Sequence, residues 1–239
     1  MLYYTSRLKT YNIDATDGEM GKIKDLYFDD KKWAIRYAII DTRKWLPGRK
    51  VLLSPTSFVN MDNDSENLEV KYDKEAVRSS PEIPEETAIS KDVENSITGY
   101  YGWNRYWAGN MLWGAIEMPW DTIPRDEMTE DQTRYNQQME EQQVYDLRSE
   151  NETLDYKVHA NDGKIGRVTD MIYDDQNWKI RYLVVRSSDS YVVEKFLVFD
   201  TEEIESVDWF EKDIYINGSV EEVNHLKIFE KKEGILPTL

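Results

Sequence analysis

The side chains of this chain that could do chemistry are mostly carboxylates, and one group of three occurs twice. The group is Asp25, Asp29 and Asp30, with copies at Asp170, Asp174 and Asp175. Carboxylate oxygens are the ligands of hard cations such as Ca²⁺, so a cation site is one hypothesis. The spacing lacks the alternating ligands of a calcium loop, so we favour a structural role in turns and ion pairs.

Other catalytic signals are absent from the sequence. The two histidines, His159 and His225, lie in dissimilar contexts, and His159 aligns with Asp14 in the first copy of the repeat described below. The chain has no cysteine, Gly-x-Ser-x-Gly motif, phosphate-binding loop or dinucleotide fingerprint. We therefore expect no catalytic, cofactor-binding or metal-binding residues and no cofactor, and an enzyme is the least favoured class.

The aspartates belong to a longer internal repeat that must position them. Residues 17–40 align without a gap to residues 162–185 at a constant offset of 145 positions, and ten of the 24 aligned residues are identical. A match of this length indicates two copies of one folding unit. About six short strands in each copy predict an all-β protein with two small barrels in tandem.

The hairpin inside each copy predicts a pair of structural ion pairs. If residues 29–32 form a four-residue loop, Asp25 lies directly across from Arg36, and the same construction places Asp170 across from Arg181. Opposite charges at facing positions of two strands stabilise a sheet. Gly21 and its copy Gly166 lie inside strands, where glycine usually marks a bulge, a bend or a close backbone approach.

The connector between the copies carries the best candidate for specific recognition. Its aromatic side chains are Tyr100, Tyr101, Trp103, Tyr106, Trp107 and Trp113. Tyr and Trp are frequent anchors of protein interfaces. The structural alternative, in which the segment covers a barrel or dimerises the chain, is favoured, because so many exposed aromatic rings would promote aggregation.

Composition excludes several classes of partner. The 47 acidic side chains outnumber the 30 basic ones, giving a formal net charge of −17. Nucleic acids and acidic lipids are bound by clusters of Lys and Arg, so neither is expected as a partner. Polar residues interrupt the most apolar stretch, 99–120, so we expect no membrane insertion and a cytoplasmic location.

The predicted organisation follows from these features. It comprises a first repeat at 1–82, a connector at 83–149, a second repeat at 150–232 and a tail at 233–239. Within the connector, an aromatic and glycine-rich segment at 99–120 precedes an acidic, polar linker at 121–149 with little or weak helix.

The repeated motif resembles the PRC-barrel family, named for the cytoplasmic domain of the photosynthetic reaction centre H subunit. The resemblance rests on Asp-Gly, Gly, Asp, Asp, Trp and Ile-Arg-Tyr in order, followed by Leu-Leu-Ser-Pro at 52–55. It covers 1–82 and 150–232, and the aromatic motif at 100–107 is similar to that of tandem PRC-barrel proteins of bacteria. The resemblance implies a barrel used mostly for interaction, and it does not supply a molecular function.

Two functions from different classes follow as expectations. The first is a non-catalytic binding or scaffold module for an unidentified protein partner, with a homodimer as a further expectation. The second is a soluble accessory factor of an electron-transfer or photosynthetic-type membrane complex, by analogy with the H subunit.

Overall fold

The computed structural model describes residues 1–85, 88–121, 146–187, 195–224 and 228–239, and it divides into two compact units. The repeat-one unit consists of Lys9–Leu147 and Gln176–Trp178. The repeat-two unit consists of Met1–Leu8, Arg148–Asp175 and Lys179–Leu239. The units therefore differ from the repeats read in the sequence, because short segments of the chain are built into the unit of the other repeat.

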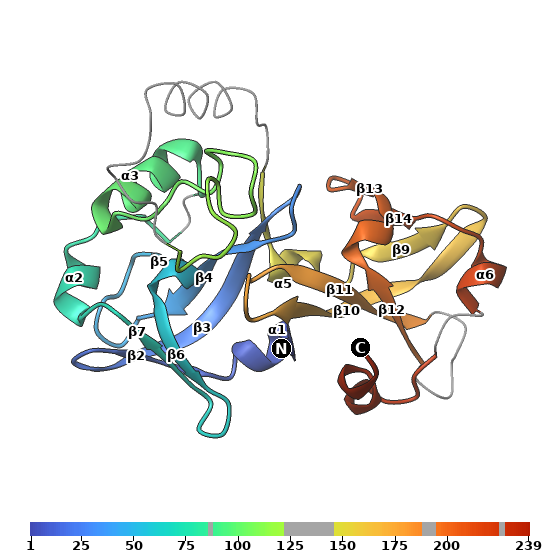
Figure 1. Cartoon of the computed structure of the whole chain (residues 1–239), viewed down its shortest axis with the longest axis horizontal. Helices are drawn as coiled ribbons and strands as arrows, with labels where there is room; N and C mark the ends of the chain where they lie inside the picture. Colours follow the sequence, from blue (N-terminus) through green and yellow to red (C-terminus); the bar gives the residue numbers. More distant parts are fainter. Residues whose placement is uncertain (86–87, 122–145, 188–194, 225–227) are drawn as a thin grey trace. The chain divides into compact units, whose positions relative to one another are not determined.

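The repeat-one unit is built on one curled sheet with the strand order β5-β4-β3-β2-β7-β6, and β8 pairs with β3 (Figure 1). Its strands are β2 (Asn12–Ala15), β3 (Gly18–Asp29), β4 (Ile35–Asp41), β5 (Val51–Leu53), β6 (Phe58–Asp62) and β7 (Asn67–Val70). Strand β8 (Leu147–Ser149) lies where the chain passes from this unit, which ends at Leu147, into the repeat-two unit. All pairs that are described in detail are antiparallel except β2 with β7, which is parallel.

The repeat-two unit repeats this plan with the order β12-β11-β10-β9-β14-β13, and β1 pairs with β10. Its strands are β1 (Leu2–Tyr4), β9 (Lys157–Ala160), β10 (Gly163–Asp174), β11 (Ile180–Ser187), β12 (Phe196–Asp200), β13 (Ile204–Asp208) and β14 (Asp213–Ile216). The parallel pair recurs as β9 with β14. The prediction of an all-β protein with two similar sheets is confirmed.

Short helices connect and cover the strands. They are α1 (Thr5–Leu8), α2 (Lys74–Arg78), α3 (Lys91–Tyr101), α5 (Glu150–Thr153) and α6 (Val220–Asn224), with 3-10 turns η1 (Pro55–Ser57), η2 (Thr201–Glu203), η3 (Lys232–Gly234) and η4 (Leu236–Thr238). In the sequence, residues 73–78 before Ser80-Pro81 predict a single helical turn, and α2 confirms this prediction. The sequence does not predict α3. Ser90 caps the start of α3 and Gly102, with φ 68°, ends it. The predicted linker lies mostly outside the described residues.

The predicted register of the repeat-one hairpin is wrong. Asp25 lies opposite Ile39 in β4 and not opposite Arg36. The loop is 30–33 and not 29–32, since the N–H of Asp29 donates to the carbonyl of Ala34, and the β3–β4 ladder also contains two register shifts. The shifts lie between Ile23 and Asp25 and between Tyr27 and Phe28. Each shift changes which residues face each other, so a constant pairing sum fails along the strand.

The second hairpin departs from prediction in the same way. Asp170 lies opposite Val184 in β11 and not opposite Arg181. The four-residue loop lies one residue later than predicted, since the N–H of Asp174 donates to the carbonyl of Lys179. Its last residue, Trp178, adopts φ 58°, and the counterpart Trp33 adopts φ 57°. This left-handed conformation is rare for a tryptophan, so sequence propensity favours another turn.

The prediction for the two strand glycines is confirmed. A Cβ atom on Gly21 would lie 2.1 Å from the carbonyl oxygen of Asp41, and one on Gly166 would lie 2.0 Å from that of Arg186. Both glycines also adjoin a register shift against the preceding strand. The backbones approach so closely there that only glycine fits.

Each unit has its own apolar core. In repeat two, Ile172, Val184, Phe196, Phe229 and Ile235 form a buried cluster. In repeat one, the strands bury residues including Phe28, Ile35, Tyr37 and Leu53. Segments that follow the strands also contribute to these cores. In repeat two they supply Phe229 and Ile235, and in repeat one the connector supplies Trp103 and Tyr106.

Candidate functional site

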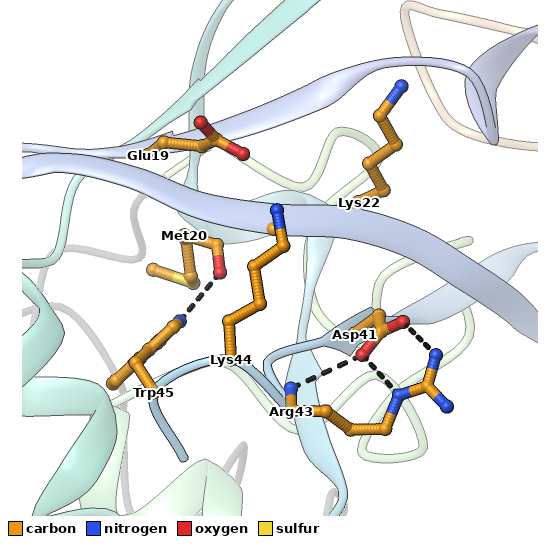
Figure 2. Close-up of a pocket in the computed structure, with 8 residues that line it drawn as sticks. Glu19, Met20, Lys22, Asp41, Arg43, Lys44 and Trp45 are labelled. Carbon is orange, nitrogen blue, oxygen red and sulfur yellow. Dashed lines mark hydrogen bonds and ion pairs between the residues drawn. The ribbon is translucent and has the colours of Figure 1, made fainter. Parts of the chain in front are cut away.

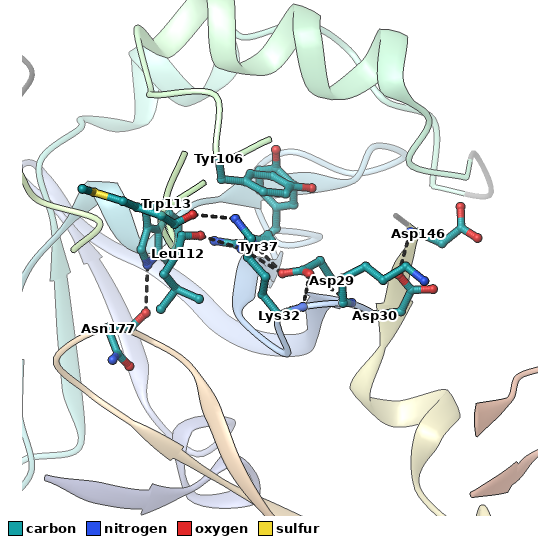
Figure 3. A network of polar contacts seen from close by, with 12 residues as sticks. Asp29, Asp30, Lys32, Tyr37, Tyr106, Leu112, Trp113, Asp146 and Asn177 are labelled. Carbon is teal, nitrogen blue, oxygen red and sulfur yellow. Dashed lines mark hydrogen bonds and ion pairs between the residues drawn. The ribbon is translucent and has the colours of Figure 1, made fainter. Parts of the chain in front are cut away.

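A buried ion pair lies beneath the aromatic connector of the repeat-one unit (Figure 3). Nε and Nη2 of Arg36 in β4 both lie 2.9 Å from Oδ2 of Asp29, the last residue of β3. The other oxygen, Oδ1, accepts from the backbone N–H groups of Lys31 and Lys32 at 3.1 and 2.6 Å. Arg36 therefore pairs with the aspartate of the turn, which corrects the prediction of a pair with Asp25.

The connector completes the surroundings of Arg36. The guanidinium carbon lies 4.2 Å from the ring centroid of Tyr106 and 4.7 Å from that of Trp113, and Nη2 donates to the carbonyl oxygen of Leu112 at 2.8 Å. Nη1 has no hydrogen-bond partner within the described residues. Cation–π attraction is strongest where water is excluded, so the two rings compensate part of the cost of burying the charge.

A second buried carboxylate, that of Glu94, links the connector to strand β4. Oε1 of Glu94 in α3 accepts from the hydroxyl groups of Tyr37, at 3.1 Å, and Tyr106, at 2.5 Å. Burial raises the pKa of Glu94, although both hydroxyl groups favour its charged form. Burial also raises the pKa of both tyrosines, so the hydroxyl groups remain donors at neutral pH.

The aromatic segment is therefore largely part of the repeat-one core. Trp103, Tyr106, Trp107 and Trp113 are buried, whereas Tyr100 is 43% exposed. Tyr101 stacks on Trp103 with a centroid distance of 4.5 Å. We call residues 91–117 the lid. Its burial favours the structural alternative over a recognition segment.

The equivalent ion pair in repeat two is more open. Nη2 of Arg181 lies 3.3 Å from Oδ2 of Asp174, with the two side chains 33% and 19% exposed. Arg181 thus also pairs with the turn aspartate seven positions before it, which corrects the prediction of a pair with Asp170. The turn aspartate is a partner that sequence spacing could have suggested.

Asp170 instead anchors other segments of the repeat-two unit. It is fully buried, and its Oδ2 lies 2.6 Å from Nζ of Lys232. Its Oδ1 accepts from the hydroxyl of Thr5 at 3.0 Å and from the backbone N–H of Ser6 at 3.2 Å. No local sequence signal points to these partners, because they lie more than 60 residues away in the chain.

The remaining candidates for chemistry also have structural partners. Nε2 of His159 lies 3.0 Å from Oδ1 of Asp213, and this contact lowers the pKa of the Asp213 carboxyl. His225 lies outside the described residues. Within the described ranges, no group of three or more His, Asp or Glu side chains is arranged to hold a metal ion. No described helix is long and apolar enough to cross a membrane.

A pocket of about 690 Å³ lies on the repeat-one sheet, between the start of β3 and the loop after β4 (Figure 2). It is lined by Glu19, Met20, Gly21, Lys22, Asp41, Arg43, Lys44 and Trp45. Sequence reasoning did not identify it, because the lining residues come from two segments that only the sheet brings together.

Only some of the charged side chains that line the pocket form ion pairs. Arg43 holds Asp41 with two hydrogen bonds of 2.8 and 2.6 Å, which lower the pKa of that carboxyl to about 2. Among the residues that the structure describes, Nζ of Lys22 donates only to the backbone carbonyl of Thr10, at 3.1 Å, and Lys44 has no ion pair. Trp45 is fixed by its Nε1, which donates to the carbonyl of Met20 at 2.7 Å. The pocket therefore offers ammonium groups beside an oriented apolar ring.

Comparison with known proteins gives one family match. Residues 2–77 match the PRC-barrel domain family, which covers the first repeat. No curated protein matches the chain. The match supports the resemblance that the repeated motif carries in the first repeat.

Proposed function

We propose that the second repeat is also a PRC-type barrel, so that the chain is a tandem PRC-barrel protein. The two copies share ten identical residues over 24 positions, and the two sheets have the same strand order at an offset of seven strands. The shared parallel pairs, β2 with β7 and β9 with β14, support the same conclusion.

The function that we propose for this protein is non-catalytic binding of a protein partner in the cytoplasm, as a scaffold or adaptor. The conspicuous carboxylates and His159 are engaged in structural contacts, which favours binding over catalysis. The connector aromatics are mostly buried, which directs attention to other surfaces.

The pocket on the repeat-one sheet is the observation that carries this proposal. The lining has three basic side chains against the two acidic ones, Glu19 and Asp41, so this concave surface carries a formal charge of +1 in a protein whose net charge is −17. Lys22 and Lys44 supply the ammonium groups beside the ring of Trp45. A carboxylate of a partner gains from the ammonium groups, and an adjacent apolar side chain gains from the ring. The partner that fits is a protein segment with an acidic residue next to an aromatic or aliphatic one.

Affinity capture from native lysate tests this function. The full-length chain is compared with the double variant Lys22→Glu/Lys44→Glu and with Lys31→Glu, an exposed lysine of the same unit that lies outside the pocket. We expect a captured protein that is reduced at least about tenfold by the double variant and retained by the control. Equal capture by all three proteins would contradict the pocket as the binding face.

Two further outcomes of the same experiment bear on the function itself. Absence of any saturable partner for all three proteins contradicts a scaffold role. Capture only from the membrane fraction, together with a redox complex, would support the accessory electron-transfer role in place of the scaffold.

A further inference from the structure

The first eight residues of the chain form an arm that belongs to the unit of the other repeat. The arm, Met1–Leu8, contains β1 and α1 and continues at Lys9 into the repeat-one unit. Strand β1 pairs antiparallel with β10, with Leu2 opposite Asp174 and Tyr4 opposite Ile172. Residues that precede repeat one thus complete the sheet of repeat two.

The arm lies against a surface of the repeat-two unit that we call the seat, formed by β10 with Asp170 and by Glu150. Thr5 is fully buried, and its hydroxyl lies 2.8 Å from Oε1 of Glu150 and 3.0 Å from Oδ1 of Asp170. A hydroxyl has one hydrogen to donate, so it bridges the two carboxylates by serving one at a time. The hydroxyl of Ser6 donates to Oδ2 of Asp170. The seat therefore recognises two consecutive hydroxyl side chains.

Apolar contacts extend the seat along the arm. Leu2 and Tyr4 pack against the buried cluster that includes Ile172, Val184 and Phe229. Loss of the arm would expose this apolar surface and would remove three of the hydrogen-bond donors of a fully buried carboxylate, Asp170. The arm and its seat are thus strongly complementary.

The same design occurs at the equivalent position of the repeat-one unit. The backbone N–H of Asp30 donates to the carbonyl of Asp146 at 3.0 Å, just as that of Asp175 donates to the carbonyl of Met1 at 3.0 Å. Both donors and both acceptors are separated by the repeat offset of 145 residues. Strand β8 pairs with β3 as β1 pairs with β10. In each case the short strand that leads into one repeat pairs with the long strand of the other repeat.

We propose that the seat on β10 also accepts the arm of a second copy of this chain, giving an arm-exchanged dimer. The contacts in the seat would be identical in the closed chain and in the dimer, and only the connection at Leu8 and Lys9 would differ. The closed form is favoured by the effective concentration of a tethered arm, on the order of millimolar. The dimer therefore increases as the protein concentration approaches that value.

Disulfide trapping tests the exchange cleanly, because the chain has no cysteine. Leu2 and Asp174 are Cα partners across β1 and β10, so Leu2→Cys and Asp174→Cys place two thiols within reach in the seated state. The double variant on one chain should form an intramolecular disulfide. The two single variants, mixed and incubated at rising concentration, should form a disulfide-linked heterodimer.

A matched control uses Leu2→Cys mixed with Glu205→Cys, an exposed position of β13 in the same unit that does not belong to the seat. We expect at least about tenfold more heterodimer from the seat pair than from the control pair near millimolar protein, falling on dilution. Efficient intramolecular disulfide in the double variant, together with no excess heterodimer at any concentration, would overturn the proposal. Failure of the double variant to close would overturn the seat itself.

Discussion

The Asp–Arg pair of the repeat is buried in repeat one and partly exposed in repeat two. Asp29 and Arg36 have side chains that are 3% and 0% exposed, against 19% and 33% for Asp174 and Arg181. The pairing geometry is encoded in the repeat, since in both copies the arginine reaches the turn aspartate seven positions before it. The ion pair of repeat one is buried because the lid, which lies outside the repeat, covers Arg36 with Tyr106 and Trp113.

This difference changes what the same two side chains contribute to stability. An exposed pair contributes about 0–1 kcal/mol, because water and salt screen it. A buried pair is costly to break, because removal of one partner leaves the other charged and desolvated. Identical residues in two copies are thus not energetically equivalent.

The largest effect on stability is expected from replacing Arg36, and the same substitution at Arg181 should have a much smaller effect. Arg36→Met should destabilise the repeat-one unit by about 3–5 kcal/mol, since Asp29 stays buried without its partner. Arg181→Met should cost the repeat-two unit at most about 1 kcal/mol. Hydrogen exchange of the β4 and β11 amides, followed in denaturant, reads the two units separately. Equal losses of stability in both units would contradict the dependence of the ion pair on burial.

At the strand glycines, substitution should destabilise the two repeats equally. Gly21→Ala and Gly166→Ala each place a Cβ about as close to a backbone carbonyl oxygen, so both should destabilise their units by about 3 kcal/mol. Thermal unfolding monitored by the same amide signals measures both. Alanine at a neighbouring exposed strand position, Glu19→Ala in repeat one, serves as the control and should change stability by about 0.5 kcal/mol or less.

A smaller effect is expected from the tyrosine that links the lid to Glu94. Tyr106→Phe keeps the ring over Arg36 and removes one of the two hydroxyl donors to Glu94, so it should cost about 1–2 kcal/mol. Denaturant unfolding of the repeat-one unit provides the measurement. A matched Tyr215→Phe in repeat two, at a 40% exposed tyrosine, should be nearly neutral. A neutral Tyr106→Phe would show that the hydroxyl does not hold the lid.

The pH dependence of the lid should show the same carboxylate. The folded-state pKa of Glu94 is raised by burial, so the stability linked to it is present below the unfolded value, about 4.3, and is lost as pH rises through the folded value. Glu94→Gln removes this loss while keeping an oxygen acceptor. We expect the variant to gain stability relative to the natural protein as the pH rises above the unfolded pKa of Glu94, about 4.3. An unchanged difference as the pH rises would contradict the assignment.

Much of the architecture could be predicted from sequence, because it depends on local signals. The repeat fixed the number of sheets, the glycines marked close backbone approaches, and Asp73 with the residues after it indicated α2. The register could not be predicted, because each turn starts one residue later than its sequence suggests and bulges then shift the pairing further without a distinct residue signature. The pairing of Asp170 with Thr5 and Lys232 depends on contacts between residues far apart in the chain.

The candidate site also combines features with a local sequence signal and features that depend on contacts between distant residues. The aromatic segment could be recognised as exceptional, but its burial over Arg36 depends on α3, which the polar residues of 82–98 did not suggest. The pocket depends on Lys44 and Trp45 in a loop that meets β3 only in the folded sheet. Tertiary contacts decided both features.

A double-mutant cycle between Arg36 and Trp113, measured as the unfolding free energy of the repeat-one unit, shows whether the lid stabilises the buried ion pair. The lid and the buried arginine should stabilise each other, since the guanidinium lies 4.7 Å from the indole ring. We expect a coupling free energy of about 1–2 kcal/mol between Arg36→Met and Trp113→Leu. Additive effects, with a coupling free energy near zero, would contradict this stabilisation.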